Sequence, residues 1–121
     1  MGRSYAFEIA FCEEIYQRDR NDTSIVEMLA NLYTKAGRID DGLRLDRRHV
    51  RLQPNNPTAH YNLACSLALK KKSGEAIEAI RTALELGFQD VGWMLKDPDL
   101  AGLRRTPAFR RLLREFTILP E

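Results

Sequence analysis

Apolar residues return every three or four positions through much of the chain, which places them on one face of an α-helix. The pattern is clearest in two consecutive runs: Leu63, Ala64, Leu67 and Ala68, then Ala76, Ile77, Ile80, Ala83 and Leu84. Asn56-Pro57-Thr58 supplies a cap and a preset backbone angle for the start of the first helix. Lys72-Ser73-Gly74 predicts the turn that separates the two helices. This part of the chain therefore predicts a helical hairpin.

The hairpin pattern occurs twice, and the two copies are displaced by 34 residues. At this displacement the matching positions are Leu29 and Leu63, Ala30 and Ala64, Tyr33 and Leu67, Leu43 and Ile77, Val50 and Leu84, and Leu52 and Leu86. Ala36-Gly37-Arg38 predicts the turn in the first copy. The small residues expected where antiparallel helices approach closely are Ala30 with Gly42 and Ala64 with Ala76.

Three short stretches give the repeat a family resemblance, namely Asn62-Leu63-Ala64, Gly74-Glu75-Ala76-Ile77 and Ala83-Leu84-Glu85-Leu86. With Pro54 closing the first copy, they resemble the tetratricopeptide repeat (TPR). The resemblance covers two full repeats, and residues 4–20 are similar to the second helix of a further repeat. It implies an all-α fold: a right-handed α-solenoid of antiparallel helix pairs (the TPR superhelix) with N- and C-terminal capping helices.

Some positions depart from the usual TPR pattern. His60 and Val26 stand in place of tryptophan, Phe88 in place of the second closing proline, and Asp46 and His49 in place of apolar or small residues. We expect the fold to survive these departures. The second helix of the first repeat is expected to pack less tightly because of Asp46 and His49.

The predicted organisation is a single TPR domain over residues 1–121, with an N-terminal capping helix at 4–20, repeats at 23–56 and 57–90, and a C-terminal capping segment at 91–121. Caps are needed because two repeats alone expose apolar end faces. The residues expected to cover the first repeat are Tyr5, Phe7, Ile9, Phe11, Ile15 and Tyr16. Those expected to fold back over the second are Trp93, Leu95, Leu100, Leu103, Phe109, Leu112 and Phe116.

The C-terminal segment contains two helix starts, each a capping residue followed by proline, at Asp97-Pro98 and Thr106-Pro107. They predict a broken short helix and then a terminal helix from Pro107 to Phe116. This tail is similar to an ending that follows the last repeat of some bacterial TPR proteins, which suggests a natural terminus.

Composition narrows the class of protein. Hydrophobic residues make up 44% and charged residues 30% of the chain, with a net charge of +2, which indicates a folded domain with no strong bias toward nucleic acid or an acidic membrane. No apolar stretch approaches the length of about 18 residues that reads as a membrane span, and the N-terminus lacks an apolar signal core. We therefore expect a cytoplasmic protein that does not bind a membrane.

Candidate chemistry is sparse. The chain has no P-loop, dinucleotide-binding or metalloprotease motif, and its two cysteines, Cys12 and Cys65, are isolated and typical of small core residues. His49 and His60 do not belong to a set of catalytic groups. The prediction is a protein that is not an enzyme, with no catalytic residues, metal or cofactor.

The resemblance, in contrast, implies a binding groove, because the first helices of TPR repeats line a concave surface that holds a peptide or a partner helix. At the matching positions this chain has Ser24, Glu27, Met28, Asn31 and Lys35 in the first repeat and Thr58, Tyr61, Asn62, Cys65 and Leu69 in the second. Asn31 and Asn62 could hold a peptide backbone through paired hydrogen bonds, with helix capping an equal alternative for Asn62. Glu27 stands where the TPR subclass that clamps chaperone carboxylates needs a lysine, which argues against that ligand.

The function predicted from the sequence is a protein-interaction adaptor or scaffold, whose partner is a protein or peptide held in the groove. A self-associating module, as a homodimer, is the first alternative. The second is a basic nucleic-acid-binding module that uses a stripe of Arg44, Arg47, Arg48 and Arg51. The lack of interleaved aromatic residues argues against this second alternative.

Overall fold

The computed structural model describes residues 4–116 and residue 118, so residues 117 and 119–121 of the predicted C-terminal cap lie outside the described part. The described chain is all-helical. Its elements are α1 (Ala6–Arg18), α2 (Thr23–Lys35), α3 (Ile39–Leu52), α4 (Pro57–Leu69), α5 (Ser73–Glu85), α6 (Val91–Met94), the 3-10 helix η1 (Pro98–Leu100), α7 (Ala101–Arg104) and α8 (Pro107–Glu115).

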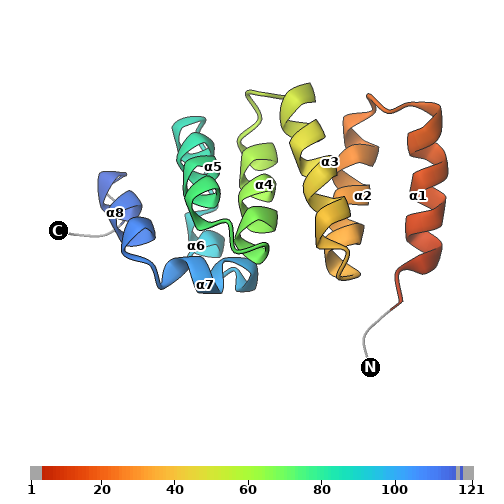
Figure 1. Ribbon diagram of the computed structural model, residues 1–121. Helices are drawn as coiled ribbons and strands as arrows, with labels where there is room; N and C mark the ends of the chain where they lie inside the picture. The colour runs from red at the N-terminus through yellow and green to blue at the C-terminus, as the bar shows by residue number, and fades with distance from the viewer. Residues whose placement is uncertain (1–3, 117, 119–121) are drawn as a thin grey trace.

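The helices are arranged in space in the order of the chain. Figure 1 shows α1 to α5 side by side, with α7 crossing the lower end of α4 and α5 and with α8 beyond α5. Each of the helices α1 to α4 packs against the next one, while η1 packs on α4 and α8 packs on α5. Packing of each unit against its sequence neighbours is the arrangement of a helical repeat. No helix in the described part is both long enough and apolar enough to cross a membrane.

The helix starts follow the capping signals in the sequence. The Asn56 side chain accepts hydrogen bonds from the backbone nitrogens of Thr58 (2.9 Å) and Ala59 (3.4 Å), and Pro57 occupies the first turn. Thr106 likewise accepts from the backbone nitrogen of Phe109 at 3.2 Å and starts α8. The predicted starts at Asn56-Pro57 and Thr106-Pro107 are therefore confirmed.

The predicted turn at Lys72-Ser73-Gly74 is wrong by two residues. Helix α4 ends at Leu69 and α5 already includes Ser73, so the chain turns at residues 70–72. Lys71 has a φ of +61°, a left-handed conformation that glycine adopts with least strain, and Gly37 has a φ of +84° at the matching position of the first hairpin. Lysine is not typical of a turn, so Lys71 gave no signal in the sequence. The prediction relied on Gly74, which lies in the first turn of α5.

Close contact between α2 and α3 depends on the small residue that the repeat places there. A Cβ atom added to Gly42 would lie 2.5 Å from Thr34 Oγ1 and 3.1 Å from the carbonyl oxygen of Ala30. The predicted close approach at Ala30 and Gly42 is thus confirmed. In the second hairpin Ala64 and Ala76 are both fully buried in one cluster.

Two clusters of buried side chains form the core. One joins α1, α2 and α3, and its largest members are Leu29, Tyr33, Leu45 and Ile9. The other joins α4, α5 and the C-terminal elements, and its largest fully buried members are Leu67, Ile80, Met94, Leu100, Phe109 and Leu112. The C-terminal segment therefore shares a core with the second hairpin.

The assignments of residues to the two ends need correction. Phe7 is 77% exposed and Phe11 60% exposed, so Ile9 and Cys12 are the residues that α1 buries against the first hairpin. The two phenylalanine rings instead stack on each other in solvent, with 6.3 Å between their centroids. At the other end Trp93 and Leu95 are exposed as well. Aromatic content does not reveal which face of a helix points inward.

Asp46 and His49, the two departures expected to loosen the packing of the second helix of the first repeat, are both buried in α3. The Asp46 carboxylate accepts a hydrogen bond from the Ser66 hydroxyl of α4. His49 Nε2 lies 2.9 Å from Gln53 Oε1. Such partners lower the cost of burying polar groups, and neither was recognised in the sequence. The other ring nitrogen of His49, Nδ1, is buried without a hydrogen-bond partner among the described residues.

Candidate functional site

A hollow of about 950 Å³ lies between α2, α4 and the segment that leads from α6 into η1. All eight residues predicted for the binding groove line it, namely Glu27, Met28, Asn31, Lys35, Tyr61, Asn62, Cys65 and Leu69, and so do Ser24 and Thr58. Residues that are three or four apart share one face of a helix, and α2 and α4 turn these faces toward the same space. The matching repeat positions thus come together in three dimensions.

The rim and the floor of this hollow differ. Asn31, Lys35 and Met28 are exposed on α2, whereas Tyr61 and Cys65 are buried in α4 and form part of the floor. Asn62 lies between these levels and donates from Nδ2 to Glu27 Oε2 at 3.4 Å, which links α4 to α2. Asn62 is in the interior of α4, so the alternative that it caps a helix is wrong.

Tyr61 ties the C-terminal segment to α4. Its hydroxyl donates to Asp97 Oδ2 at 2.6 Å, and its ring stacks on Phe88 with 4.3 Å between centroids. Asp97 Oδ1 accepts from the backbone nitrogen of Asp99 at 3.0 Å, which holds the start of η1. The Asp97 carbonyl in turn accepts from Arg104 at 2.7 Å. This buried network places residues 97–99 as the third wall of the hollow.

The wall formed by Trp93 and residues 97–99 was missed as part of the site, and so were Asp46 and Ser66 on the floor. The sequence did single out Asp97-Pro98, but only as a helix start. The bond between Tyr61 and Asp97 spans 36 residues, and the one between Asp46 and Ser66 spans 20. No repeat position predicts such pairs, since each partner looks ordinary on its own helix.

Burial raises the pKa values of three titratable groups on the floor. Burial, followed by the charge of Asp97, raises the pKa of the Cys65 thiol, so this sulfur does not act as a thiolate nucleophile. Burial and the hydrogen bond to Asp97 raise the pKa of Tyr61. Burial raises the pKa of Asp46 to about 7, against the hydrogen bond from Ser66, which lowers it. The raised pKa values of the Cys65 thiol and the Tyr61 hydroxyl suit these two groups to hydrogen bonding.

One cluster has the elements of a metal site. The ligand atoms of Cys65, Asp97 and Asp99 all lie within 4.8 Å of one another. However, Asp97 is already engaged by Tyr61 and by the backbone of Asp99, and the thiol would have to lose a proton whose pKa is raised. The chemistry of this set therefore fits a bound metal ion poorly.

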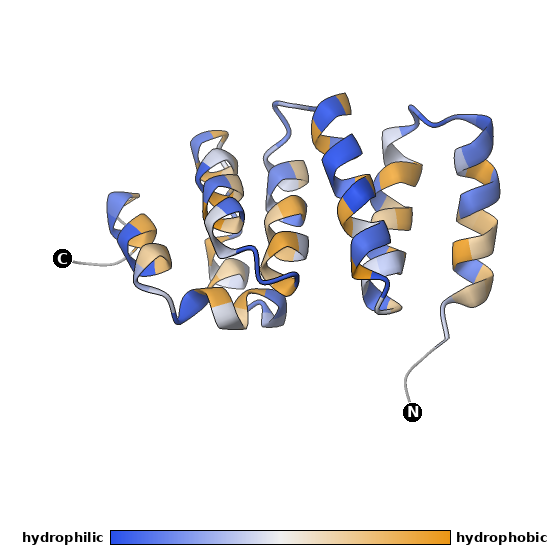
Figure 2. Cartoon of the chain, viewed as in Figure 1, coloured by the Kyte–Doolittle hydropathy of each residue, from blue (hydrophilic) through white to orange (hydrophobic). Residues whose placement is uncertain are grey.

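The arginine stripe of α3 is mostly paired with protein groups. Arg44 forms an ion pair with Asp41 (3.0 Å) and Arg47 one with Glu75 (3.2 Å). Arg48 donates to the carbonyl oxygen of Arg20 and to the Asn21 side chain, both at 2.9 Å. Figure 2 shows α3 as a largely hydrophilic helix. Arg47 thus links α3 to α5 and Arg48 links α3 to the loop before α2, whereas Arg44 pairs within α3.

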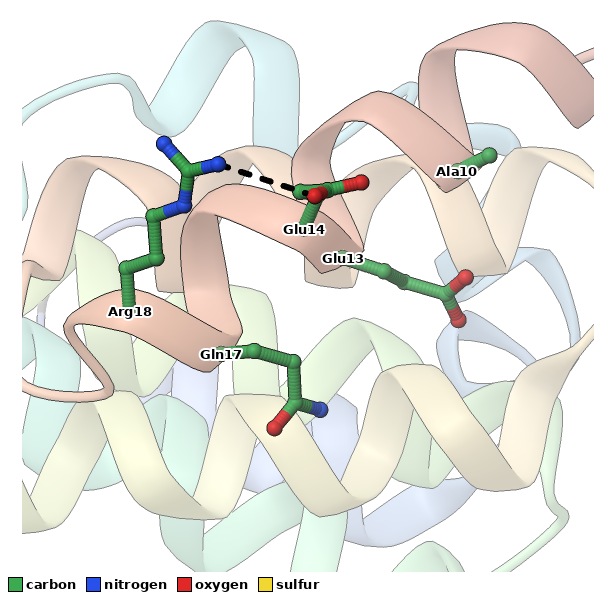
Figure 3. Close-up of a pocket in the computed structure, with 5 residues that line it drawn as sticks. All are labelled: Ala10, Glu13, Glu14, Gln17 and Arg18. Carbon is green, nitrogen blue, oxygen red and sulfur yellow. Dashed lines mark ion pairs between the residues drawn. The ribbon is translucent and has the colours of Figure 1, made fainter.

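A second hollow, of about 450 Å³, lies on α1 and is lined by Ala10, Glu13, Glu14, Gln17 and Arg18 (Figure 3). Glu14 pairs with Arg18 at 3.6 Å across one helical turn. Glu13 accepts a hydrogen bond of 2.5 Å from the Tyr33 hydroxyl, which fixes α1 to α2. All residues that line this second hollow come from α1. The Glu14–Arg18 ion pair lies within that helix and the Tyr33–Glu13 hydrogen bond joins it to α2, so helix packing explains both contacts.

The fold and site together define a class: an all-helical, repeat-like protein with a hollow between the first helices of successive hairpins. No family model matches the sequence. The chain is similar to a chloroplastic protein of Arabidopsis thaliana, at 29% identity over 90 residues, which is 69% of this chain and 26% of that protein. The match therefore spans about a quarter of the length of this curated relative.

Proposed function

We propose that this protein is a TPR-type adaptor that holds a peptide or a partner helix in the hollow between α2 and α4. One observation carries the proposal: the eight residues selected by matching repeat positions all line the same hollow. We also propose that the helix pairs form a right-handed TPR solenoid with capped ends. The close approach of α2 and α3 at Gly42 and the 34-residue repeat support its hairpin units. We propose that the protein acts in the cytoplasm.

Binding by such a hollow relies on preorganisation. Its walls are helices that share buried cores with their neighbours, and Tyr61 with Asp97 fixes the third wall. A rigid site of this kind loses little conformational entropy when a ligand binds, so less of the binding free energy is offset. Met28, which is 52% exposed, and Trp93, which is 43% exposed, provide apolar contact at the rim.

Binding is favoured over catalysis by the state of the groups in the hollow. The thiol of Cys65 and the hydroxyl of Tyr61 both have raised pKa values and both contact Asp97. A catalytic base or nucleophile needs a pKa near the working pH and a free path to substrate. Asp46 has a pKa of about 7, but it is buried and accepts a hydrogen bond from Ser66, so it lacks such a path. We therefore propose a protein without enzymatic activity or cofactor.

Self-association is the second candidate function, favoured by the outer face of α1. Phe7 and Phe11 are exposed there and stack on each other, which leaves a small apolar patch in solvent. A homodimer through this face would leave the hollow open.

The double variant Met28→Ala/Asn31→Ala tests the adaptor function, because both side chains are exposed on the rim and neither is needed for the core. The immobilised protein is used to capture partners from a lysate of its source organism, and bound proteins are quantified by mass spectrometry. We expect the amount of each wild-type partner captured to fall by about fivefold or more, as for the loss of contacts worth about 1 kcal/mol or more.

The matched control is Leu95→Ala/Gln89→Ala, which also removes one exposed apolar group and one amide, outside the hollow. It should retain the partners, and all three proteins should have the same melting temperature. Equal capture by both double variants would contradict the proposed function.

A further inference from the structure

We infer that the ligand of the hollow is a cationic peptide segment, in which lysine or arginine side chains accompany an apolar anchor residue. The inference rests on the proposed function and adds the chemical class of the partner. It follows from the distribution of charge over the walls of the hollow, which differs from that of the chain as a whole.

The walls are acidic although the chain is basic overall. Carboxyl groups of Glu27, Asp97 and Asp99 line the hollow, with Asp46 on its floor, and Lys35 is the one cation among the described residues that line it. The whole chain has a net charge of +2, so the cations are concentrated on other surfaces. A concave surface whose charge is opposite to that of the rest of the molecule steers ligands of complementary charge toward it.

Two of these carboxylates are positioned to meet a ligand. Glu27 is half-buried on α2 and Asp99 is half-buried at the start of η1, so the two acids approach the space from different walls. Burial, and then the charge of Asp97, raises the pKa of Asp99. A neighbouring cation would relieve the repulsion between Asp97 and Asp99, so it would be held more favourably here than at an isolated surface acid.

The apolar part of the ligand has its own contacts. The exposed side chains of Met28 and Trp93 lie on the rim, and Leu69 also lines the hollow. Methionine adapts to different apolar shapes, and tryptophan offers both an apolar surface and a face that attracts cations. An apolar anchor flanked by basic residues satisfies both parts of this surface, whereas an acidic segment would meet like charge.

The test uses short fluorescent peptides in which leucine and tryptophan alternate with lysine, with glutamate or with glutamine. Their affinities for the full chain are measured by fluorescence anisotropy at low and at moderate salt. We expect the lysine peptide to bind, its affinity to fall as salt rises, and the glutamate peptide not to bind. Glu27→Gln/Asp99→Asn should lower the affinity for the lysine peptide by about threefold to thirtyfold, as expected for the loss of two partly exposed ion pairs.

The charge-matched control is Glu14→Gln/Asp40→Asn, which removes two exposed acids outside the hollow. It should bind the lysine peptide as the wild type does. Equal weakening in both double variants, or no binding of the lysine peptide to the wild type, would overturn the inference. The inference would also be overturned if the wild type bound the glutamine or glutamate peptide and Met28→Ala/Asn31→Ala abolished that binding. The adaptor function would still stand in that case.

Discussion

Replacing Phe109 by alanine should lower the free energy of unfolding by about 3–5 kcal/mol, the usual cost of removing a buried phenylalanine ring. The Phe109 side chain is 1% exposed and belongs to the cluster that joins α4, α5 and the C-terminal segment. Helix α8, which carries it, packs on α5. The loss should be that large because the ring is shared between the segment and the second hairpin. Urea denaturation followed by circular dichroism measures it.

Phe11→Ala is the control for this prediction, since it removes the same ring from a position that is 60% exposed on α1. Its effect on the free energy of unfolding should stay within about 0.5 kcal/mol, as for most surface substitutions. If the two variants unfolded at the same urea concentration, the C-terminal segment would not be part of the core.

Asp46→Asn should stabilise the protein at about pH 8 by up to about 4 kcal/mol, since a pKa raised by about three units costs about 1.4 kcal/mol per unit. Burial raises the pKa of Asp46 to about 7 in the folded state. The stability that this group contributes is therefore complete below its unfolded pKa of 3.8 and is lost as the pH rises through 7. Asparagine removes the buried charge and can still accept the hydrogen bond from Ser66.

The measurement is the difference in unfolding free energy between Asp46→Asn and the wild type from about pH 4 to about pH 8. A difference is needed because other carboxyls act in the opposite direction: the hydrogen bond from Arg38, for example, lowers the pKa of Asp41. The difference should be near zero at the acidic end and should grow to its full value near neutral pH. A difference that does not change with pH would contradict the burial of an ionisable Asp46.

Much of the fold could be predicted from the sequence because its determinants are local. Asn56 and Thr106 cap helices through backbone groups two or three residues away, so their roles are visible in a short window. The close approach at Gly42 could also be predicted, since the 34-residue displacement pairs this glycine with Ala76. Repetition supplied the long-range information that a single hairpin would lack.

The hollow was predictable for the same reason, but only in part. Helical spacing fixes that Met28, Asn31 and Lys35 share a face, and the repeat brings that face beside Tyr61 and Leu69. The third wall follows no repeat, because it depends on contacts between residues far apart in the chain. The repeat identified Tyr61 as a groove residue, but it did not reveal that its hydroxyl would be occupied by Asp97.

The exposed phenylalanines show a different limit. Phe7 and Phe11 lie on α1 among other apolar residues, and the helix turns Ile9 and Cys12 inward instead. Several orientations of this helix would bury a similar apolar area, so its pattern alone does not select one. In the structure Ile9 and Cys12 join the buried cluster with α2, and the hydrogen bond from Tyr33 to Glu13 connects the same two helices.

The central claim, that the hollow between α2 and α4 receives the partner, is tested most directly by nuclear magnetic resonance. Backbone amide shifts of the full chain are recorded as a captured partner, or a peptide from it, is added. The account predicts that the largest changes fall on residues 24–35, 58–69, 93 and 97–99, with small changes on α3 and α5. Changes concentrated on α3 or on the outer face of α1, with the hollow unaffected, would contradict it.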